Sequence, residues 1–148
     1  MNEQRTEEIV HAYSRIPDGT PWEELVSDAV AALLPDTDDW LVVATDDGPA
    51  IIAIADGALY TLTTVALEDR AAMSAERFDL REGRASVSVT ETQGLGPPVR
   101  ERVRTWHLAL ERGRHLVWGT TAPLEEESDL SREERVARVI ADATGWTL

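Results

Sequence analysis

The chain lacks cysteine, lysine and any long apolar run, and the first and last of these absences each exclude a class of structure or function. Without cysteine there is no disulfide framework, thiolate metal site or thiol nucleophile, so folding depends on packing alone. The longest purely apolar runs, 29–34 and 50–55, are too short to span a membrane as a helix. The first ten residues have three glutamates, one arginine and no apolar centre. We therefore expect no secretory signal and a cytoplasmic location.

All 14 basic residues are arginine, a bias typical of GC-rich genomes such as those of actinobacteria. We derive no mechanism from it. At 148 residues the chain has the usual length of one domain, and it is long enough to bury roughly 68 to 70% of its unfolded surface. We therefore expect residues 1–148 to form a single domain.

The net charge of −14 is unevenly distributed along the chain. Residues 1–47 hold 12 acids against 2 arginines, residues 48–124 hold 9 against 9, and residues 125–148 hold 7 against 3. Such a field disfavours nucleic acid and anionic membranes as partners. It is compatible either with a solvated acidic surface or with a protein partner that is basic.

The most informative stretch is 40–65, three short apolar runs separated by Asp46-Asp47-Gly48-Pro49 and by Asp56-Gly57. Asp-Gly between two β-rich runs supplies the positive φ values that a two-residue type I′ hairpin requires. The stretch therefore predicts an antiparallel strand meander at the centre of the core.

Two helices are predicted before the meander, within residues 1–36. The first covers 3–15 and has a narrow apolar stripe of Ile9, Tyr13 and Ile16, which we interpret as a surface for a partner or for dimerisation. The second begins with a capping box from Thr20 to Glu23 and ends at Pro35. Its apolar positions share one face that should lie on the core: Trp22, Leu25, Val26, Ala29, Val30 and Leu33.

Two stretches after the meander are ambiguous. Residues 66–77 contain helix formers without a wide apolar stripe, and we favour a loop followed by a strand. The run 99–110 reads as a strand in which Arg104 would share a face with Trp106. Because one face is not easily both solvated and buried, a bulge near Thr105 or a bend across two sheets is expected. Trp118 on the next strand is predicted to pair with Trp106.

A second capping box, Ser131 to Glu134, predicts a C-terminal helix over 131–146. Gly145 is placed as the residue that ends the helix, with Trp146 folding back on its last turn. The fold class is therefore α+β, with two N-terminal helices, an antiparallel sheet over 39–121 and one C-terminal capping helix. The seven predicted strands are 39–45, 50–55, 58–65, 75–80, 85–92, 99–110 and 115–120.

This order of elements resembles the pleckstrin-homology-like (PH-like) barrel of bacterial proteins, over residues 39–146 and without a shared sequence motif. The resemblance implies a seven-stranded bent sheet or barrel whose C-terminal helix closes one open end. Phosphoinositide-binding members hold phosphate with a basic loop between the first strands. Here that loop is Asp46-Asp47-Gly48-Pro49, which would repel phosphate, so lipid binding is not carried over.

No motif predicts catalysis or a cofactor. The acids at 36–39 and 46–47 lack the glycine and glutamate of a calcium loop, and Gly94-Leu95-Gly96-Pro97 precedes no helix that would bind phosphate. His107 and His115 form either a metal or pH-sensitive pair across a hairpin or two ordinary strand histidines. We expect no catalytic residue, no metal and no cofactor, and thus a protein that is not an enzyme.

The one local positive feature is Arg100, Arg102 and Arg104 on one side of a strand. They are candidates to dock an acidic peptide or a phosphate, unless they pair with acids of the same molecule. With Ile9 and Tyr13 they are the predicted partner-binding residues.

The sequence thus favours a non-catalytic protein-interaction or adaptor module, whose N-terminal helices either cover the barrel or mediate homodimerisation. The alternative is an acidic inhibitor, of the immunity or secretion-chaperone type, that binds a basic protein. A third class, an enzyme or small-ligand binder with a pocket between the Trp22 helix and the sheet, has the least support.

Overall fold

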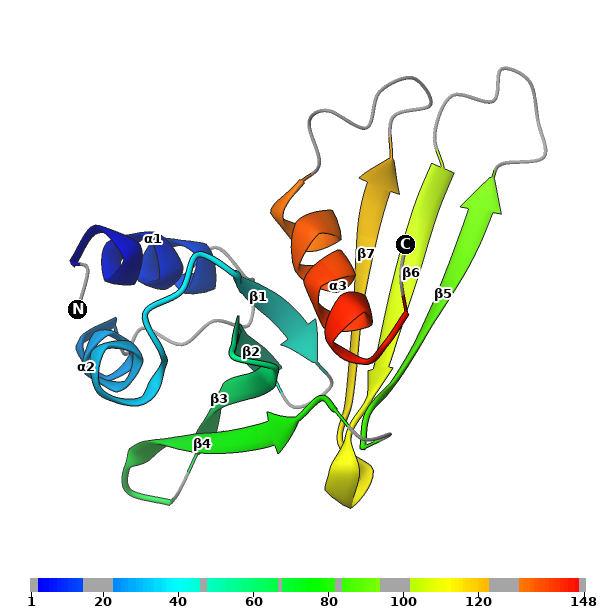
Figure 1. The fold of residues 1–148 in the computed structure, drawn as a ribbon. Helices are drawn as coiled ribbons and strands as arrows, with labels where there is room; N and C mark the ends of the chain where they lie inside the picture. Colours follow the sequence, from blue (N-terminus) through cyan, green and yellow to red (C-terminus); the bar gives the residue numbers. More distant parts are fainter. Residues whose placement is uncertain are drawn as a thin grey trace.

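The computed structural model describes residues 3–14, 23–45, 48–66, 68–81, 84–93, 102–122 and 131–146, and all statements below concern these residues. Within them the chain forms three α-helices and seven antiparallel strands (Figure 1). The elements are α1 (Glu3–Ser14), α2 (Glu23–Leu33), β1 (Trp40–Thr45), β2 (Gly48–Ala55), β3 (Ala58–Ala66), β4 (Ala71–Asp79), β5 (Ser86–Gln93), β6 (Arg102–Ala109), β7 (His115–Ala122) and α3 (Arg132–Ala143).

The first sheet has the order β1-β2-β3-β4 and contains the predicted meander. Asp56 and Gly57 have φ values of 53° and 75°, and Ala55 pairs with Ala58, so the two-residue hairpin is confirmed. The ambiguous stretch 66–77 does not form a helix where it is described. The strand predicted for 75–80 forms as β4, but it begins at Ala71, four residues earlier than predicted.

The second sheet has the order β5-β6-β7, and Trp106 of β6 pairs with Trp118 of β7 as predicted. The expected bulge near Thr105 is absent, because pairing with β5 continues without interruption from Arg102 to Ala109. Nor does β6 cross between sheets: both its neighbours lie in this one. The face with Arg104 and Trp106 is instead covered by α3, whose own acid binds the arginine.

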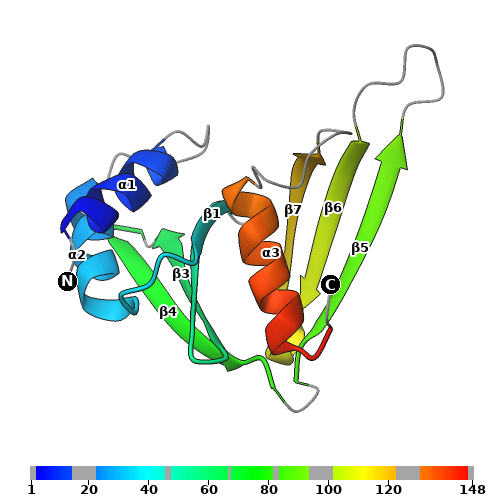
Figure 2. The same ribbon diagram turned by 45° about the horizontal axis from the view of Figure 1, so that its top comes forward.

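The two sheets lie at an angle to each other with α3 between them (Figures 1 and 2). Helix α3 contacts β1, β2 and β7, and Val136 and Ile140 on its buried face join a core made by the inner faces of both sheets. No hydrogen-bonded strand pair joins the sheets within the described residues. The α+β class with seven antiparallel strands is therefore confirmed, whereas a single closed barrel is not what forms.

A second core lies on the outer face of the first sheet, where α1 and α2 pack (Figure 1). Ile9 and Tyr13 are 0% and 1% exposed, so these two residues, which we expected to meet a partner, pack within the chain. Ile16, the third residue of the predicted stripe, lies outside the described residues. Helix α2 does lie on the core as predicted, but Leu34 is 4% exposed while Leu33 is 48% exposed. The buried leucine at the end of α2 is thus Leu34, directly after the helix, and not the predicted Leu33.

Both ends of α3 follow the sequence prediction. The Ser131 side chain accepts a hydrogen bond from the Glu134 backbone N–H. At the other end Gly145 has φ 94°, its N–H donates to the Asp142 carbonyl, and the Trp146 N–H donates to the Ala141 carbonyl, which is a Schellman motif. The capping box from Thr20 and the Asp46-Asp47 turn lie outside the described residues.

Candidate functional site

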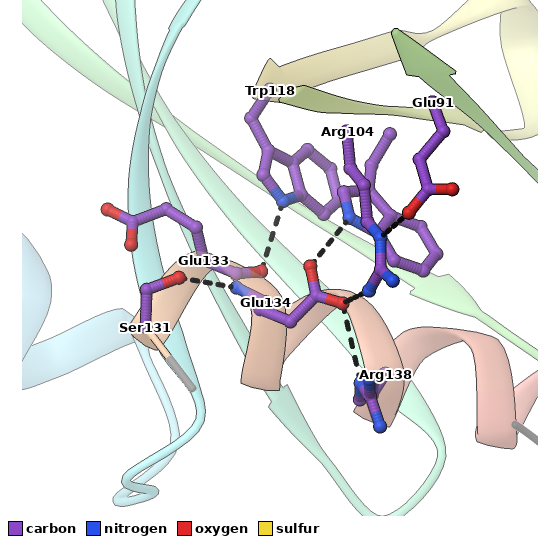
Figure 3. Close-up of polar contacts among 8 residues, drawn as sticks. Glu91, Arg104, Trp118, Ser131, Glu133, Glu134 and Arg138 are labelled. Carbon is purple, nitrogen blue, oxygen red and sulfur yellow. Dashed lines mark hydrogen bonds and ion pairs between the residues drawn. The ribbon is translucent and has the colours of Figure 1, made fainter. Parts of the chain in front are cut away.

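Of the three arginines predicted to bind a partner, Arg104 is the one whose side chain the structure describes, and it is held by acids of its own chain (Figure 3). Its Nε lies 2.7 Å from Glu91 Oε1 on the neighbouring strand β5. Its Nη1 forms an ion pair with Glu134 of α3. Arg100 lies outside the described residues, and of Arg102 only the backbone is described. The interpretation in which the arginines pair within the molecule holds for Arg104.

Glu134 is the centre of this cluster and one of four buried polar or charged residues among those described, with 4% of its surface exposed. Besides Arg104 it accepts hydrogen bonds from Trp106 Nε1 at 3.3 Å and from Arg138 Nε at 3.4 Å. A buried carboxylate is tolerated only when it is paired and hydrogen-bonded in this way. Trp118 Nε1 donates to the backbone carbonyl of Glu133, 3.2 Å away, which attaches the same turn of α3 to β7.

The electrostatics of the cluster are those of a structural ion pair. The Glu91 carboxylate is the main cause that raises the pKa of Arg104; Glu134 adds to this, and burial opposes it. A base with a raised pKa keeps its stabilising charge until the pH rises through that pKa. Arg104 therefore stays charged at physiological pH, and the cluster fixes α3 to the second sheet.

The surface that has charge to offer a partner is a groove between α1 and α2, with a volume of about 510 Å³. Three carboxylates from two helices line it together with the apolar side chain of Val10. Its described lining is Glu7, Val10, His11, Ser14, Glu23, Glu24 and Ser27. No arginine is among these residues. We call this surface the acidic groove.

The acidic groove is marked by the gathering of three carboxylates in one hollow; exposed acids elsewhere, such as Glu68 and Asp142, also form no ion pair among the described residues. Glu7, Glu23 and Glu24 form no ion pair in the part of the chain that is described. Arginines elsewhere are engaged. Among the described arginine side chains, all but Arg135 bind carboxylates (Arg5, Arg70, Arg84, Arg104, Arg112, Arg114, Arg138) or other oxygens of the chain (Arg77, Arg81, Arg132).

A second cleft, of about 540 Å³, opens between the inner faces of the two sheets. Thr61, Thr63 and Ser74 line it from the first sheet and Arg114 from the second. Its one described carboxylate, Glu76, is bound by Arg112 at 3.1 Å and by Arg114 at 2.8 Å. This triad ties the β6–β7 turn to β4 and leaves the cleft lined mainly by hydroxyl and apolar groups.

The histidines do not converge on one site. His11 lines the acidic groove, while His107 and His115 lie together on the outer face of the second sheet. Among the described residues there is no group of three histidines or carboxylates that could hold a metal ion. Where the helices are described, none is long and apolar enough to cross a membrane.

Sequence reasoning missed the acidic groove, although the excess of acids before residue 48 was its signal. Placing Glu7 beside Glu23 and Glu24 requires knowledge of how α1 packs against α2, which depends on long-range contacts with the sheet. Comparison with models of protein families, with curated proteins and with solved structures found no match to the chain.

Proposed function

We propose that the chain is a non-catalytic protein-interaction module that binds a basic protein through the acidic groove. The observation that supports this most directly is the convergence of Glu7, Glu23 and Glu24 on one hollow, whose described lining contains no arginine. Carboxylates left without internal partners, on a chain of net charge −14, favour a cationic ligand.

The groove suits a basic side chain or a short basic segment. Val10, which is half-buried and lines the groove, can contact the methylene groups of a lysine or arginine, whose charged end would reach the carboxylates. An exposed ion pair contributes only about 0.2 to 1 kcal/mol. Affinity would therefore come from several such pairs together with steering by the net charge, and it should fall as salt is added.

The two helices provide a firm support for such a site. Ile9, Tyr13, Val26 and Val30 are buried against each other and the first sheet, and Tyr13 Oη is hydrogen-bonded to Thr64 Oγ1 on β3. Because the helices are packed before any partner arrives, the carboxylates are arranged in advance and binding orders few side chains.

We propose the PH-like superfold as the architecture of this module. Support comes from the order of elements, four strands and then three, followed by a helix that packs between the two sheets. A second candidate role, an acidic inhibitor of the immunity or secretion-chaperone type, uses the same groove and differs in what the partner does when it is free. In both roles the protein acts in the cytoplasm.

The test is affinity capture from the cells that produce the protein, with two variants of equal charge. The first carries Glu7→Gln, Glu23→Gln and Glu24→Gln in the acidic groove. The matched control carries Glu68→Gln, Asp69→Asn and Asp142→Asn, three exposed acids of which two lie between β3 and β4 and one lies in α3. Circular dichroism checks that both variants keep the helical content of the native chain.

We expect the native chain and the control to capture the same basic protein, and the groove variant to lose it by at least tenfold. Capture should also fall between about 50 mM and about 500 mM salt, since the Debye length shortens over this range. Capture that survives in the groove variant, or equal loss in both variants, would show that the site lies elsewhere.

A further inference from the structure

We infer that the outer face of the second sheet is a self-association surface, at which two copies of the chain pack together. We call it the bare face. Because strand side chains alternate, it consists of every second residue of β5, β6 and β7. The described members are Ser86, Ser88, Thr90, Thr92, Val103, Thr105, His107, Ala109, His115, Val117 and Gly119.

The described positions of the bare face hold no aspartate, glutamate or arginine. Of all residues in the chain, 28% are charged, so about three of these eleven positions would be expected to be charged, and more on an exposed surface. A sheet face that meets only water can hold charged side chains as well as hydroxyl groups. The absence of charge from the exposed side of all three strands is the observation that points to a contact.

The composition of the bare face is that of a surface which can pack on itself. Val103 and Val117 are 38% and 42% exposed, and both belong to it. Ser88, His107 and Val117 form one row across the three strands. A shallow hollow of about 370 Å³ lies over His107 and His115. Hydroxyl and imidazole groups both donate and accept hydrogen bonds, so the same face on a second copy offers matching partners.

Charge selects a second copy as the occupant. Two chains of net charge −14 repel each other, and they approach at lowest cost through surfaces that lack carboxylates. The bare face is such a surface, and it lies on the opposite side of the molecule from α1 and α2 (Figures 1 and 2). A basic partner would instead be attracted to the helical side.

The size of the face predicts a weak dimer. Strands are about 4.8 Å apart and rise about 3.3 Å per residue, so three strands of eight residues span roughly 14 Å by 26 Å. Two copies would then bury roughly 730 Å² between them, which is below the roughly 1,200 Å² of stable complexes, so the dimer forms only at high concentration. In such a dimer the two acidic grooves face outward, which would let one assembly hold two basic sites. The inference itself does not depend on what the groove binds.

The experiment is analytical ultracentrifugation of the full chain from about 1 µM to about 500 µM, the range in which a weak dimer of this size should form. Val117→Glu places a charge in the bare face. Val65→Glu is the matched control, because Val65 is 39% exposed on β3 of the other sheet and the net charge changes equally. Ser88→Glu, on β5 in the same row as Val117, is a second test of the face.

We expect the native chain and Val65→Glu to shift from monomer to dimer over this range, and Val117→Glu and Ser88→Glu to dimerise at least tenfold more weakly. Added salt should favour the dimer, because it screens repulsion between the copies. A native chain that stays monomeric at the highest concentration would overturn the inference. So would a dimer that both bare-face variants retain, or that Val65→Glu loses equally.

Discussion

The outer faces of the two sheets differ in whether helices cover them. On the first sheet, Trp40, Ile51 and Leu62 point outward and are covered by α1 and α2. On the second sheet the outward positions hold serine, threonine, histidine and valine, and no described element covers them. This chain therefore buries the outer face whose alternate residues are large and apolar. The outer face that it does not bury has no charged residue at its described positions.

The inner faces show the complementary rule. Both sheets contribute apolar residues to the core around α3, and the one described arginine at its edge on β6, Arg104, is matched by Glu134 of the helix. The buried carboxylate of this core thus enters it together with cationic and hydrogen-bonding partners. The predictions below test how firmly each face is held.

The largest effect should come from the covered face. We expect Leu34→Ala to lower the free energy of unfolding by about 3 kcal/mol, because it leaves a cavity between α2 and the first sheet. Leu33→Ala, one residue earlier and 48% exposed, is the control and should cost less than about 0.5 kcal/mol. Urea unfolding followed by circular dichroism measures both. Equal losses would mean that α2 does not pack as described.

The next effect concerns the attachment of α3 to the second sheet. Glu134→Gln should cost about 2 to 3 kcal/mol, because Arg104 loses a charged partner in a half-buried position. Glu133→Gln removes a carboxylate from the same turn, where its side chain has no ion pair among the described residues, and should cost about 0.5 kcal/mol. The difference between the two variants in urea midpoint isolates the buried contacts. A difference near zero would contradict the structural role of the cluster.

A smaller loss of stability is expected from substitutions in one turn of each sheet. Gly57→Ala should destabilise by about 1 to 2 kcal/mol, because φ is 75° and the added Cβ would meet the Arg81 guanidinium. Gly113→Ala, at φ 70° with open space around it, should cost only the backbone strain of about 1 kcal/mol. Thermal unfolding of the two variants ranks them. The reverse ranking would show that the first hairpin is not the tighter turn.

The smallest effect on stability should come from the bare face. In dilute solution, where the chain is monomeric, Val117→Glu should change the free energy of unfolding by less than about 0.5 kcal/mol. Its effect should appear only in self-association. A large loss of monomer stability would mean that this valine contributes to folding and that the face is not bare.

Local sequence patterns predicted much of this fold, because the turns and helix ends are specified by residues close together in the chain. Asp56-Gly57 specifies its own turn, Ser131 and Gly145 bound their own helix, and the alternation in β5 specifies which side is apolar. These are interactions within a few residues. The two-helix, seven-strand, one-helix order followed from them.

The rest depended on contacts between distant residues. The narrow stripe of Ile9 and Tyr13 does not show from sequence what it packs against. Arg104 shares a strand face with Trp106, and the acid that pairs with it, Glu134, lies 30 residues later. The acidic groove likewise needs two helices to be placed side by side. The roles of non-enzyme and protein binder, the cytoplasmic location and the single-domain assignment stay predictions.

The most direct test of the central claim, that the helical side holds the partner, is hydrogen–deuterium exchange of the chain with and without its captured partner. We predict that peptides from α1 and α2 exchange more slowly in the complex, and that peptides from β5 to β7 do not change at concentrations where the chain is monomeric. Protection confined to β5, β6 or the Arg104 region, with α1 and α2 unaffected, would contradict the account.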